Sequence, residues 1–301
     1  MGQKLAESVP ELAELYRRAN DIVGYDLAKI CFEGPAEKLD TTEISQPAIF
    51  VTSVACLTAL RMGKTADELA QVEPEACLGL SLGEYTALYA GKAIGFEDGI
   101  RLVQLRGRAM QAAAGQRKGT MVSILGLDEQ QVNKLCQAVL EESPQEEDAL
   151  EPLLVPVNFN CPGQIVLSGS VRACERAAER AEEFGAIRAI PLRVAGAFHT
   201  KMMAPAARQL GLALKECNFS QPRMKVVANV DGLVYDNSEQ IPDKLLRQLI
   251  GAVRWQQSIE FLLERGAERF VEIGPGRVLT GLLKKISRAR KQKIEILTVG
   301  G

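Results

Sequence analysis

A Gly-x-Ser-x-Gly core at residues 79–83 is the feature of this sequence that most restricts its fold. The apolar run 76–79 leads into the core and the helix-forming run 84–88 leads out of it, which is the pattern of a nucleophile elbow. In an elbow a strand turns directly into a helix, so we expect Gly79 and Gly83 to supply the room that the turn needs around Ser81. The motif is short, and a glycine-flanked turn serine without chemistry is the alternative.

Ser81 would lie at the N-terminus of the following helix, where free backbone N–H groups and the helix dipole favour a developing oxyanion. A serine hydroxyl needs a base at neutral pH. The sequence contains one histidine, His199, in a Gly-Ala-Phe-His loop after a predicted strand, and this is the candidate base. A structural role for His199, or a lysine or carboxylate as the base, remains the alternative.

The composition is that of an ordinary globular chain. Its 301 residues, 47% of them apolar, suffice for one large domain, alone or with a smaller one. The formal net charge of −2, with both signs mixed along the chain, gives no global field for nucleic acid or a membrane surface. Seven cysteines without a Cys-x-x-Cys pair indicate reduced thiols, and one histidine leaves little for a zinc site. We expect no membrane span, since no apolar run reaches about 18 residues.

The first part of the chain is predicted to be mostly helical. Residues 8–11, Ser-Val-Pro-Glu, have the capping-box spacing and predict a helix that ends near Gly24. Residues 48–60 are apolar almost all round and predict a buried helix, whereas the charged residues 64–74 predict a loop. From Phe96 onward apolar residues recur at helical spacing, with Arg106 beside the stripe. Periodicity alone would make Arg106 a surface or salt-bridged arginine.

Residues 118–194 are predicted to run strand, helix, strand, strand, helix, strand, which is the order of a ferredoxin-like small domain. The acidic stretch 141–148 within it predicts a solvated loop. Residues 1–117 and 195–301 alternate strands and helices and predict a large α/β domain with a mostly parallel sheet. In the small domain the predicted strands are 121–127, 153–159, 165–168 and 187–192, and the helices 128–141 and 171–184. The later predicted elements of the large domain are helices 205–217, 241–249 and 258–265, strands 225–230 and 269–273, and a last helix after the turn 274–276.

Several segments together resemble the malonyl-CoA:acyl-carrier-protein transacylases. They are residues 79–85 (Gly-Leu-Ser-Leu-Gly-Glu-Tyr), Arg106-Gly107 with Met110, residues 158–169, Ala197-Phe198-His199 and residues 272–276 (Glu-Ile-Gly-Pro-Gly). Their order and approximate spacing follow the family over essentially the whole chain. The resemblance implies an α/β-hydrolase-like large domain with an inserted ferredoxin-like small domain and an active site in the cleft between them. It implies no cofactor and no metal, because the CoA thioester is a substrate.

The resemblance also assigns roles to residues. Ser81 corresponds to the nucleophile that is acylated, and His199 corresponds to its base. Gln248 matches the glutamine whose backbone carbonyl orients that histidine, so that the pair is a dyad without an aspartate. The backbone N–H of Leu82 is one expected oxyanion donor.

Substrate selection is assigned in the same way. Arg106 corresponds to the arginine whose planar guanidinium pairs with the free carboxylate of the malonyl group, which replaces the surface role suggested by periodicity. Phe198 stands in the Ala-Phe-His triplet of malonyl-selective members. The implied activity is transfer of malonyl from malonyl-CoA to the phosphopantetheine thiol of acyl carrier protein, through a malonyl-serine, in fatty acid or polyketide synthesis.

Two features depart from the family pattern. Leu80 stands where the family usually has histidine, beside an unchanged nucleophile. The family begins with a strand and a Gly-Gln-Gly-Ser-Gln loop, and no such loop occurs in this sequence. We therefore expect this chain to lack that strand and the second oxyanion donor, and to have reduced stability and activity.

Two rival functions use the same residues. A serine hydrolase shares the elbow chemistry, but hydrolysis of neutral esters has no need for Arg106. A catalytically silent module that binds carrier protein would form no acyl-enzyme. We expect a monomer in the cytoplasm without nucleic-acid or membrane partners, and an organellar presequence stays open.

A basic segment near the end of the sequence is a candidate for docking an acidic carrier protein, and a solvated helix end is the alternative. Six basic residues lie within it: Lys284, Lys285, Arg288, Arg290, Lys291 and Lys293.

Overall fold

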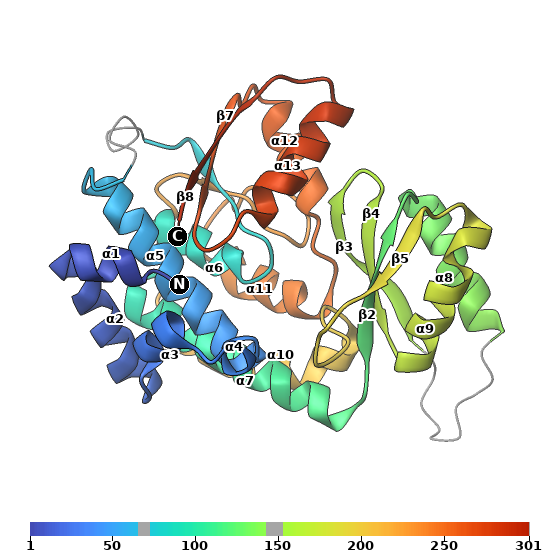
Figure 1. The fold of residues 1–301 in the computed structure, drawn as a ribbon, viewed down its shortest axis with the longest axis horizontal. Helices are drawn as coiled ribbons and strands as arrows, with labels where there is room; N and C mark the ends of the chain where they lie inside the picture. Colours follow the sequence, from blue (N-terminus) through green and yellow to red (C-terminus); the bar gives the residue numbers. More distant parts are fainter. Residues whose placement is uncertain (66–72, 143–152, 301) are drawn as a thin grey trace.

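The computed structural model describes residues 1–65, 73–142 and 153–300. The predicted loops at 64–74 and 141–148 lie mostly outside these ranges. In Figure 1 the helices of the larger part lie on the left, and a four-stranded sheet with its helices lies on the right. The larger part is built from both ends of the chain, so the four-stranded sheet is an insertion within it.

Helices fill the chain before the elbow, and the predicted capping box at Ser8 is wrong. Ser8 is the last residue of a preceding helix, and its hydroxyl donates to the Leu5 carbonyl oxygen (3.2 Å). Val9 therefore takes the position before the next helix, and Pro10 lies in its first turn, where a missing N–H is tolerated. The helices are α1 (Gln3–Ser8), α2 (Pro10–Val23), α3 (Leu27–Glu33), α4 (Ala36–Leu39) and α5 (Thr42–Arg61).

Helix α5 is the buried helix predicted at residues 48–60, but it begins at Thr42 and contains Pro47. The polar residues before Pro47 obscured its start, yet Gln46 is buried there. By length and overall composition its 20 residues could cross a membrane, although polar residues such as Gln46 interrupt its apolar run. Most of it, 78%, is buried inside the protein, as in the core helix of a globular domain.

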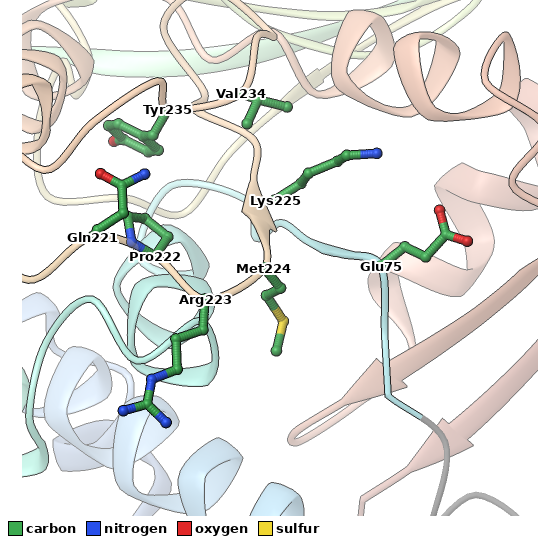
Figure 2. Close-up of a pocket in the computed structure, with 8 residues that line it drawn as sticks. All are labelled: Glu75, Gln221, Pro222, Arg223, Met224, Lys225, Val234 and Tyr235. Atoms are coloured by element: carbon green, nitrogen blue, oxygen red, sulfur yellow. The ribbon is translucent and has the colours of Figure 1, made fainter.

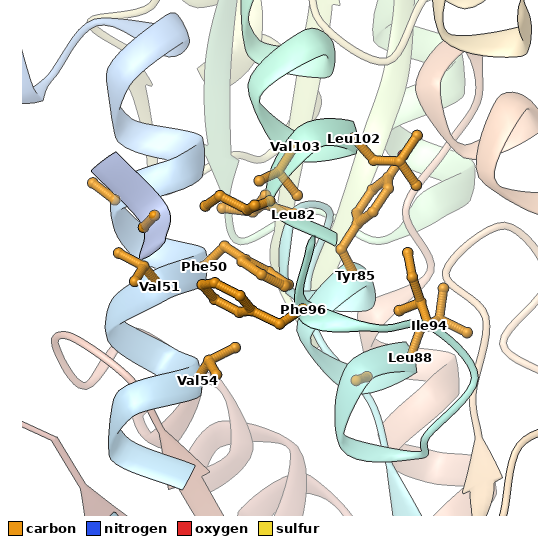
Figure 3. Packing of buried hydrophobic residues seen from close by; sticks show 14 of the residues in the cluster. Phe50, Val51, Val54, Leu82, Tyr85, Leu88, Ile94, Phe96, Leu102 and Val103 are labelled. Atoms are coloured by element: carbon orange, nitrogen blue, oxygen red, sulfur yellow. The ribbon is translucent and has the colours of Figure 1, made fainter. Parts of the chain in front are cut away.

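Helices α6 (Gly83–Ala90) and α7 (Phe96–Gln116) pack with α5 around the main core. Figure 3 shows this core, in which the rings of Phe50 and Phe96 stack with their centroids 6.1 Å apart. The backbones of α5 and α7 approach closely, because a Cβ on Gly107 would lie only 2.6 Å from the Thr42 carbonyl oxygen. This close packing directs the buried face of α7 toward α5 and the elbow.

The four-stranded sheet has the ferredoxin-like topology predicted from the sequence. Its strands are antiparallel in the order β3-β4-β2-β5, and its helices cover a separate apolar cluster. The boundaries expected at 117/118 and 194/195 stay a prediction. The elements are β2 (Thr120–Leu125), α8 (Glu129–Glu141), β3 (Leu154–Cys161), β4 (Gln164–Gly169), α9 (Val171–Arg180), the 3₁₀ helix η2 (Ala181–Phe184) and β5 (Arg188–Pro191).

The strands of the larger part are parallel, as predicted, but in the described residues they form two separate pairs rather than one sheet. Strand β1 (Ala76–Cys77) pairs with β6 (Lys225–Val226), and β7 (Arg269–Ile273) pairs with β8 (Glu295–Val299). β1 and β6 are shorter than predicted because the chain leaves the ladder at Leu78 to form the elbow. Side chains join the pairs instead, since Leu78 and Leu80 pack in the same cluster as Phe270.

The remaining helices follow the insertion and close the structure. They agree closely with the predicted ones except that α12 begins and ends earlier than expected, at Trp255 and Leu263, and that the 3₁₀ helix η3 was not predicted. A parallel bridge between Asn158 and Val253 connects the small sheet to the segment between α11 and α12. They are the 3₁₀ helix η3 (Lys201–Met203), α10 (Ala204–Glu216), α11 (Gln240–Ile250), α12 (Trp255–Leu263) and α13 (Val278–Ala289).

Candidate active site

The elbow joins β1 to α6 with Ser81 at its tip. Ser81 has a left-handed backbone conformation, φ +52°, which is uncommon for a residue other than glycine and is typical of strained functional positions. Gly79 is required, because a Cβ there would lie 2.1 Å from the backbone of Gly83. The expected need for Gly83 is wrong: a Cβ at that position would meet nothing within 4 Å. The turn brings the backbone of Gly83 against the Cα of Gly79, so a side chain has no room at Gly79 but has room at Gly83.

Asn229 holds both sides of this turn, and the sequence analysis missed it. Its Oδ1 accepts a hydrogen bond from the Ser81 N–H (2.6 Å), and its Nδ2 donates to the Gly79 carbonyl oxygen (2.7 Å). The side chain is fully buried, so both backbone groups would otherwise lack a partner away from water. Asn229 was hidden inside the predicted strand 225–230. That strand is parallel to β1, and residues at the ends of parallel strands meet at one edge.

The structure brings His199 to Ser81. Nε2 of His199 lies 2.9 Å from Oγ of Ser81, and Nδ1 lies 2.8 Å from the backbone oxygen of Gln248. A carbonyl oxygen can only accept, so Nδ1 carries the hydrogen and the neutral ring presents the Nε2 lone pair to the serine hydroxyl. Burial, with a smaller effect from the Arg106 charge, lowers the pKa of His199 to about 4. The imidazole is therefore neutral at pH 7 and able to accept a proton.

The loop that carries His199 is fixed from both sides. His199 is also left-handed, with φ +62°. The Ser168 hydroxyl on β4 donates to the Phe198 carbonyl oxygen (2.8 Å), and Thr200 donates through Oγ1 to Ala197 (2.8 Å). Both units of the fold thus contribute to the position of the base. Phe198 itself is half-buried and packs between the main core and a cluster on the small sheet.

Arg106 reaches the same serine from α7. Only 1% of Arg106 is exposed, and its guanidinium donates to the side-chain oxygens of Gln46 (2.8 Å), Ser81 (2.9 Å) and Gln248 (3.0 Å). Its Nε has no partner, and its contacts within the described ranges include no ion pair with a carboxylate. The guanidinium also lies over the Tyr85 ring, 5.7 Å from its centroid, but a buried cation without a direct anionic contact is unfavourable unless an anion joins it. The site is thus suited to a carboxylate ligand.

Glu84 lies beneath the site and was also missed by the sequence analysis, since an acid in the first turn of a helix has an ordinary explanation. It is fully buried on α6. Its carboxylate accepts from the Tyr235 hydroxyl, the Asn229 N–H (3.1 Å) and Nε2 of Gln248 (2.8 Å). Burial outweighs these hydrogen bonds and raises its pKa to about 7.

The backbone N–H of Leu82 remains available for an oxyanion. Leu82 directly follows Ser81 at the start of α6, and within the ranges that the structure describes its N–H has no hydrogen-bond acceptor. By contrast, the Ser81 N–H is already used by Asn229. An acyl oxygen on Ser81 would therefore meet the Leu82 donor together with the positive end of the α6 dipole.

The acyl transferase domain family matches residues 1–300 of this chain. The chain belongs to this family. The malonyl CoA-acyl carrier protein transacylase of Bacillus subtilis (strain 168) is 39% identical to it over 291 residues, which make up 97% of this chain and 87% of that protein. This match confirms the resemblance drawn from the sequence motifs.

Solved structures of malonyltransferases have a fold similar to that of this chain. The acyl carrier protein S-malonyltransferase of Vibrio cholerae O1 biovar eltor str. N16961 has a TM-score of 0.87 and 37% identity, and the match covers 98% of this chain and 90% of that one. A malonyl-transacylase in complex with its type II PKS acyl-carrier protein has a TM-score of 0.88 and 38% identity, and the match covers 100% of this chain and 91% of that one. The predicted α/β fold class is confirmed.

A separate open pocket of this acyl transferase lies beside β1 and β6 (Figure 2). Its volume is about 480 Å³, and Ser81, His199 and Arg106 do not line it. The residues that line it include Glu75, Arg223, Lys225 and Tyr235. Among the described residues no three or more histidine, cysteine or acidic side chains form a group that could hold a metal.

Proposed function

We propose that this acyl transferase moves malonyl from malonyl-CoA to the phosphopantetheine thiol of acyl carrier protein, in fatty acid or polyketide synthesis. The relatives named malonyl CoA-acyl carrier protein transacylase support the reaction. The observation that carries the choice of acyl group is the buried Arg106 guanidinium, 2.9 Å from the Ser81 hydroxyl and without a directly contacting anion among the described residues. A hydrolase of neutral esters would have no use for this cation.

The proposed reaction has two halves. Oγ of Ser81 attacks the thioester carbonyl while Nε2 of His199 takes the hydroxyl proton. The C–S bond then breaks, and the imidazolium returns this proton to the leaving CoA thiolate. In the second half His199 takes the proton of the carrier thiol, whose sulfur attacks the malonyl-serine ester, and the proton returns to Ser81.

Three further groups stabilise the charges that this reaction creates or brings into the site. The Leu82 N–H, which is free of other acceptors in the described part of the chain, donates to the oxyanion of each tetrahedral intermediate. The backbone oxygen of Gln248 holds Nδ1 of His199 and stabilises the imidazolium as it forms. The Arg106 guanidinium binds the malonyl carboxylate through its planar fork.

The decisive experiment is intact-mass spectrometry after brief exposure to malonyl-CoA. We expect the mass to rise by one malonyl group, located on Ser81 by peptide mapping, and holo acyl carrier protein to remove it. The Ser81→Ala variant is the control and should not gain mass. Release of free malonate without transfer to the carrier would favour a hydrolase, and no acylation at all would favour a silent binding module.

We propose that the basic segment of α13 and the residues after it dock the acidic carrier protein. Lys284, Arg288, Lys291 and Lys293 are exposed, whereas Arg290 is engaged by Glu264. Reversal of Lys284 and Arg288 to glutamate should raise the KM for carrier protein and leave acylation by malonyl-CoA unchanged. Reversal of Lys215, an exposed lysine on α10, serves as the control. An unchanged KM would leave these residues as a solvated helix end.

We also propose that the reaction needs no cofactor or metal, and that the protein acts as a cytoplasmic monomer without nucleic-acid or membrane partners. The formal net charge of only −2 supports the proposal that the protein has no nucleic-acid or membrane partner. Sedimentation at working concentration tests the monomer, and activity after dialysis against a chelator tests the independence from metal.

A further inference from the structure

The side chain of Gln248 connects two buried charges of the site. Its Oε1 accepts from Nη2 of Arg106 (3.0 Å), and its Nε2 donates to Oε2 of Glu84 (2.8 Å) and to the Ser81 carbonyl oxygen (2.8 Å). All three side chains have 1% or less of their surface exposed, so water does not substitute for these contacts.

The Glu84 carboxylate and the Ser81 carbonyl oxygen together decide which end of the Gln248 amide faces Arg106. Above about pH 7 Glu84 is ionised and only accepts hydrogen bonds, and the nitrogen of an amide only donates them. With Nε2 held by Glu84, Oε1 must point at the guanidinium. If the amide turned over, its NH₂ group would face the N–H groups of Arg106, and Oε1 would face the carboxylate oxygen of Glu84.

The Gln248 amide also keeps the Glu84 carboxylate out of direct contact with the Arg106 guanidinium. A carboxylate in direct contact with Arg106 would occupy the fork of the guanidinium and compete with an anionic substrate. Glu84 lies one amide away, where in its ionised form it offsets the buried positive charge in a medium of low dielectric constant while Nε of Arg106 stays without a partner. The Asn229 N–H donates to the same Glu84 oxygen as Gln248, and the Tyr235 hydroxyl donates to the other, so both oxygens of the carboxylate are fixed.

We propose that Glu84 is a positioning residue for malonyl selection: through the Gln248 carboxamide it holds the Arg106 guanidinium in the orientation that receives the carboxylate of the acyl group. This role rests on the proposed function. It extends that function by naming a residue that sets the preference for an acidic acyl group without touching the substrate.

The test compares Glu84→Gln with the wild type in acylation by malonyl-CoA and by acetyl-CoA at pH 8, where Glu84 is ionised. The variant has nearly the same shape, and its amide oxygen can still accept from Gln248, but the negative charge is gone and the charge-assisted hydrogen bond becomes a weaker neutral one. We expect the KM for malonyl-CoA to rise on the order of tenfold relative to that for acetyl-CoA, the size expected when a hydrogen bond to a charged group is replaced by a neutral one. Tyr235→Phe is the matched control: it removes a hydrogen bond from the same carboxylate without altering the amide, and should leave the malonyl-to-acetyl ratio within about twofold.

A double-mutant cycle separates positioning from a merely structural role. In an Arg106→Ala background, Glu84→Gln should have no further effect on the malonyl-to-acetyl ratio, because the group through which it acts is gone. An equal loss for both acyl groups, or a ratio that still shifts in that background, would overturn the role of Glu84.

Two further measurements keep the result decisive. If Glu84→Gln does not fold, Gln248→Met breaks the same bridge and leaves the backbone carbonyl that holds His199; it should shift the ratio in the same direction, and an unshifted ratio overturns the proposal. Wild-type acylation is measured alongside. Wild-type protein that forms no malonyl-serine refutes the proposed function, whereas normal wild-type acylation with an unshifted ratio in the variants refutes only the role of Glu84.

Discussion

Nη2 of Arg106 donates a hydrogen bond to Oγ of Ser81 over 2.9 Å. The group proposed to bind the substrate carboxylate thus touches the proposed nucleophile before any substrate is present. A malonyl group on Ser81 has its carboxylate only a few bonds from Oγ, so the same guanidinium is within reach of it in the acyl-enzyme.

Replacement of Arg106 by alanine should separate the acyl groups. We expect malonyl transfer to fall by about 10²-fold or more, because a buried carboxylate without its partner is disfavoured by roughly 2–5 kcal/mol. Acetyl transfer should be retained or should rise. Steady-state rates with both CoA esters measure this, with Arg108→Ala, an exposed arginine on the same helix, as the control. Equal losses for both acyl groups would contradict the assignment of Arg106.

Loss of the nucleophile or the base should affect acylation differently. Ser81→Ala removes the attacking oxygen and should abolish malonyl-serine. For the base we choose His199→Asn, because asparagine tolerates the left-handed backbone at this position better than alanine does. It should slow acylation by about 10²–10⁴-fold, the usual contribution of a general base. Rapid-quench mass spectrometry measures both rates, and normal acylation of either variant would mean that the pair is misassigned.

The sequence has a single histidine, so NMR can follow the titration of His199 without ambiguity. We expect a midpoint near pH 4, because burial and Arg106 lower the pKa from its ordinary value. The unfolded chain binds this proton more strongly, so the contribution of His199 to stability is complete above about pH 6.5 and is lost as the pH falls through the window down to about 4.

Arg106→Ala should raise this midpoint, since one of the causes of the lowered pKa is the charge of Arg106. The Arg108→Ala variant should leave it in place. A wild-type midpoint between about 6 and 7 would show a solvated imidazole and contradict the buried geometry.

The two glycines of the elbow should respond differently to alanine. Gly79→Ala places a methyl group 2.1 Å from the Gly83 backbone and should destabilise the protein by about 1–3 kcal/mol or more. Gly83→Ala points into open space at the first residue of α6 and should change the free energy of unfolding by less than about 1 kcal/mol. Urea unfolding of the pair measures both, and equal destabilisation would contradict the elbow geometry.

The sequence by itself determined the features that local physics controls. The elbow at Ser81 could be predicted because a sharp strand-to-helix turn needs a glycine at position 79, and the order of the small sheet could be predicted because each of its elements has its own periodicity. The errors were also local: Ser8 belongs to α1 rather than capping α2, and α5 begins before Pro47. The resemblance to the transacylases added Arg106, Gln248 and Leu82.

Only the tertiary structure decided how the charges of the site are arranged. Periodicity shows that a side chain lies near a buried face, but it does not show which atom it meets there, so Arg106 had the pattern of a surface arginine. Its contact with Gln248 spans 142 positions, and that of Ser81 with Asn229 spans 148. Glu84 looked like an ordinary first-turn acid for the same reason. A buried polar group is defined by its partners, and these are brought together by the packing of α5, α6, α7 and α11 rather than by local sequence.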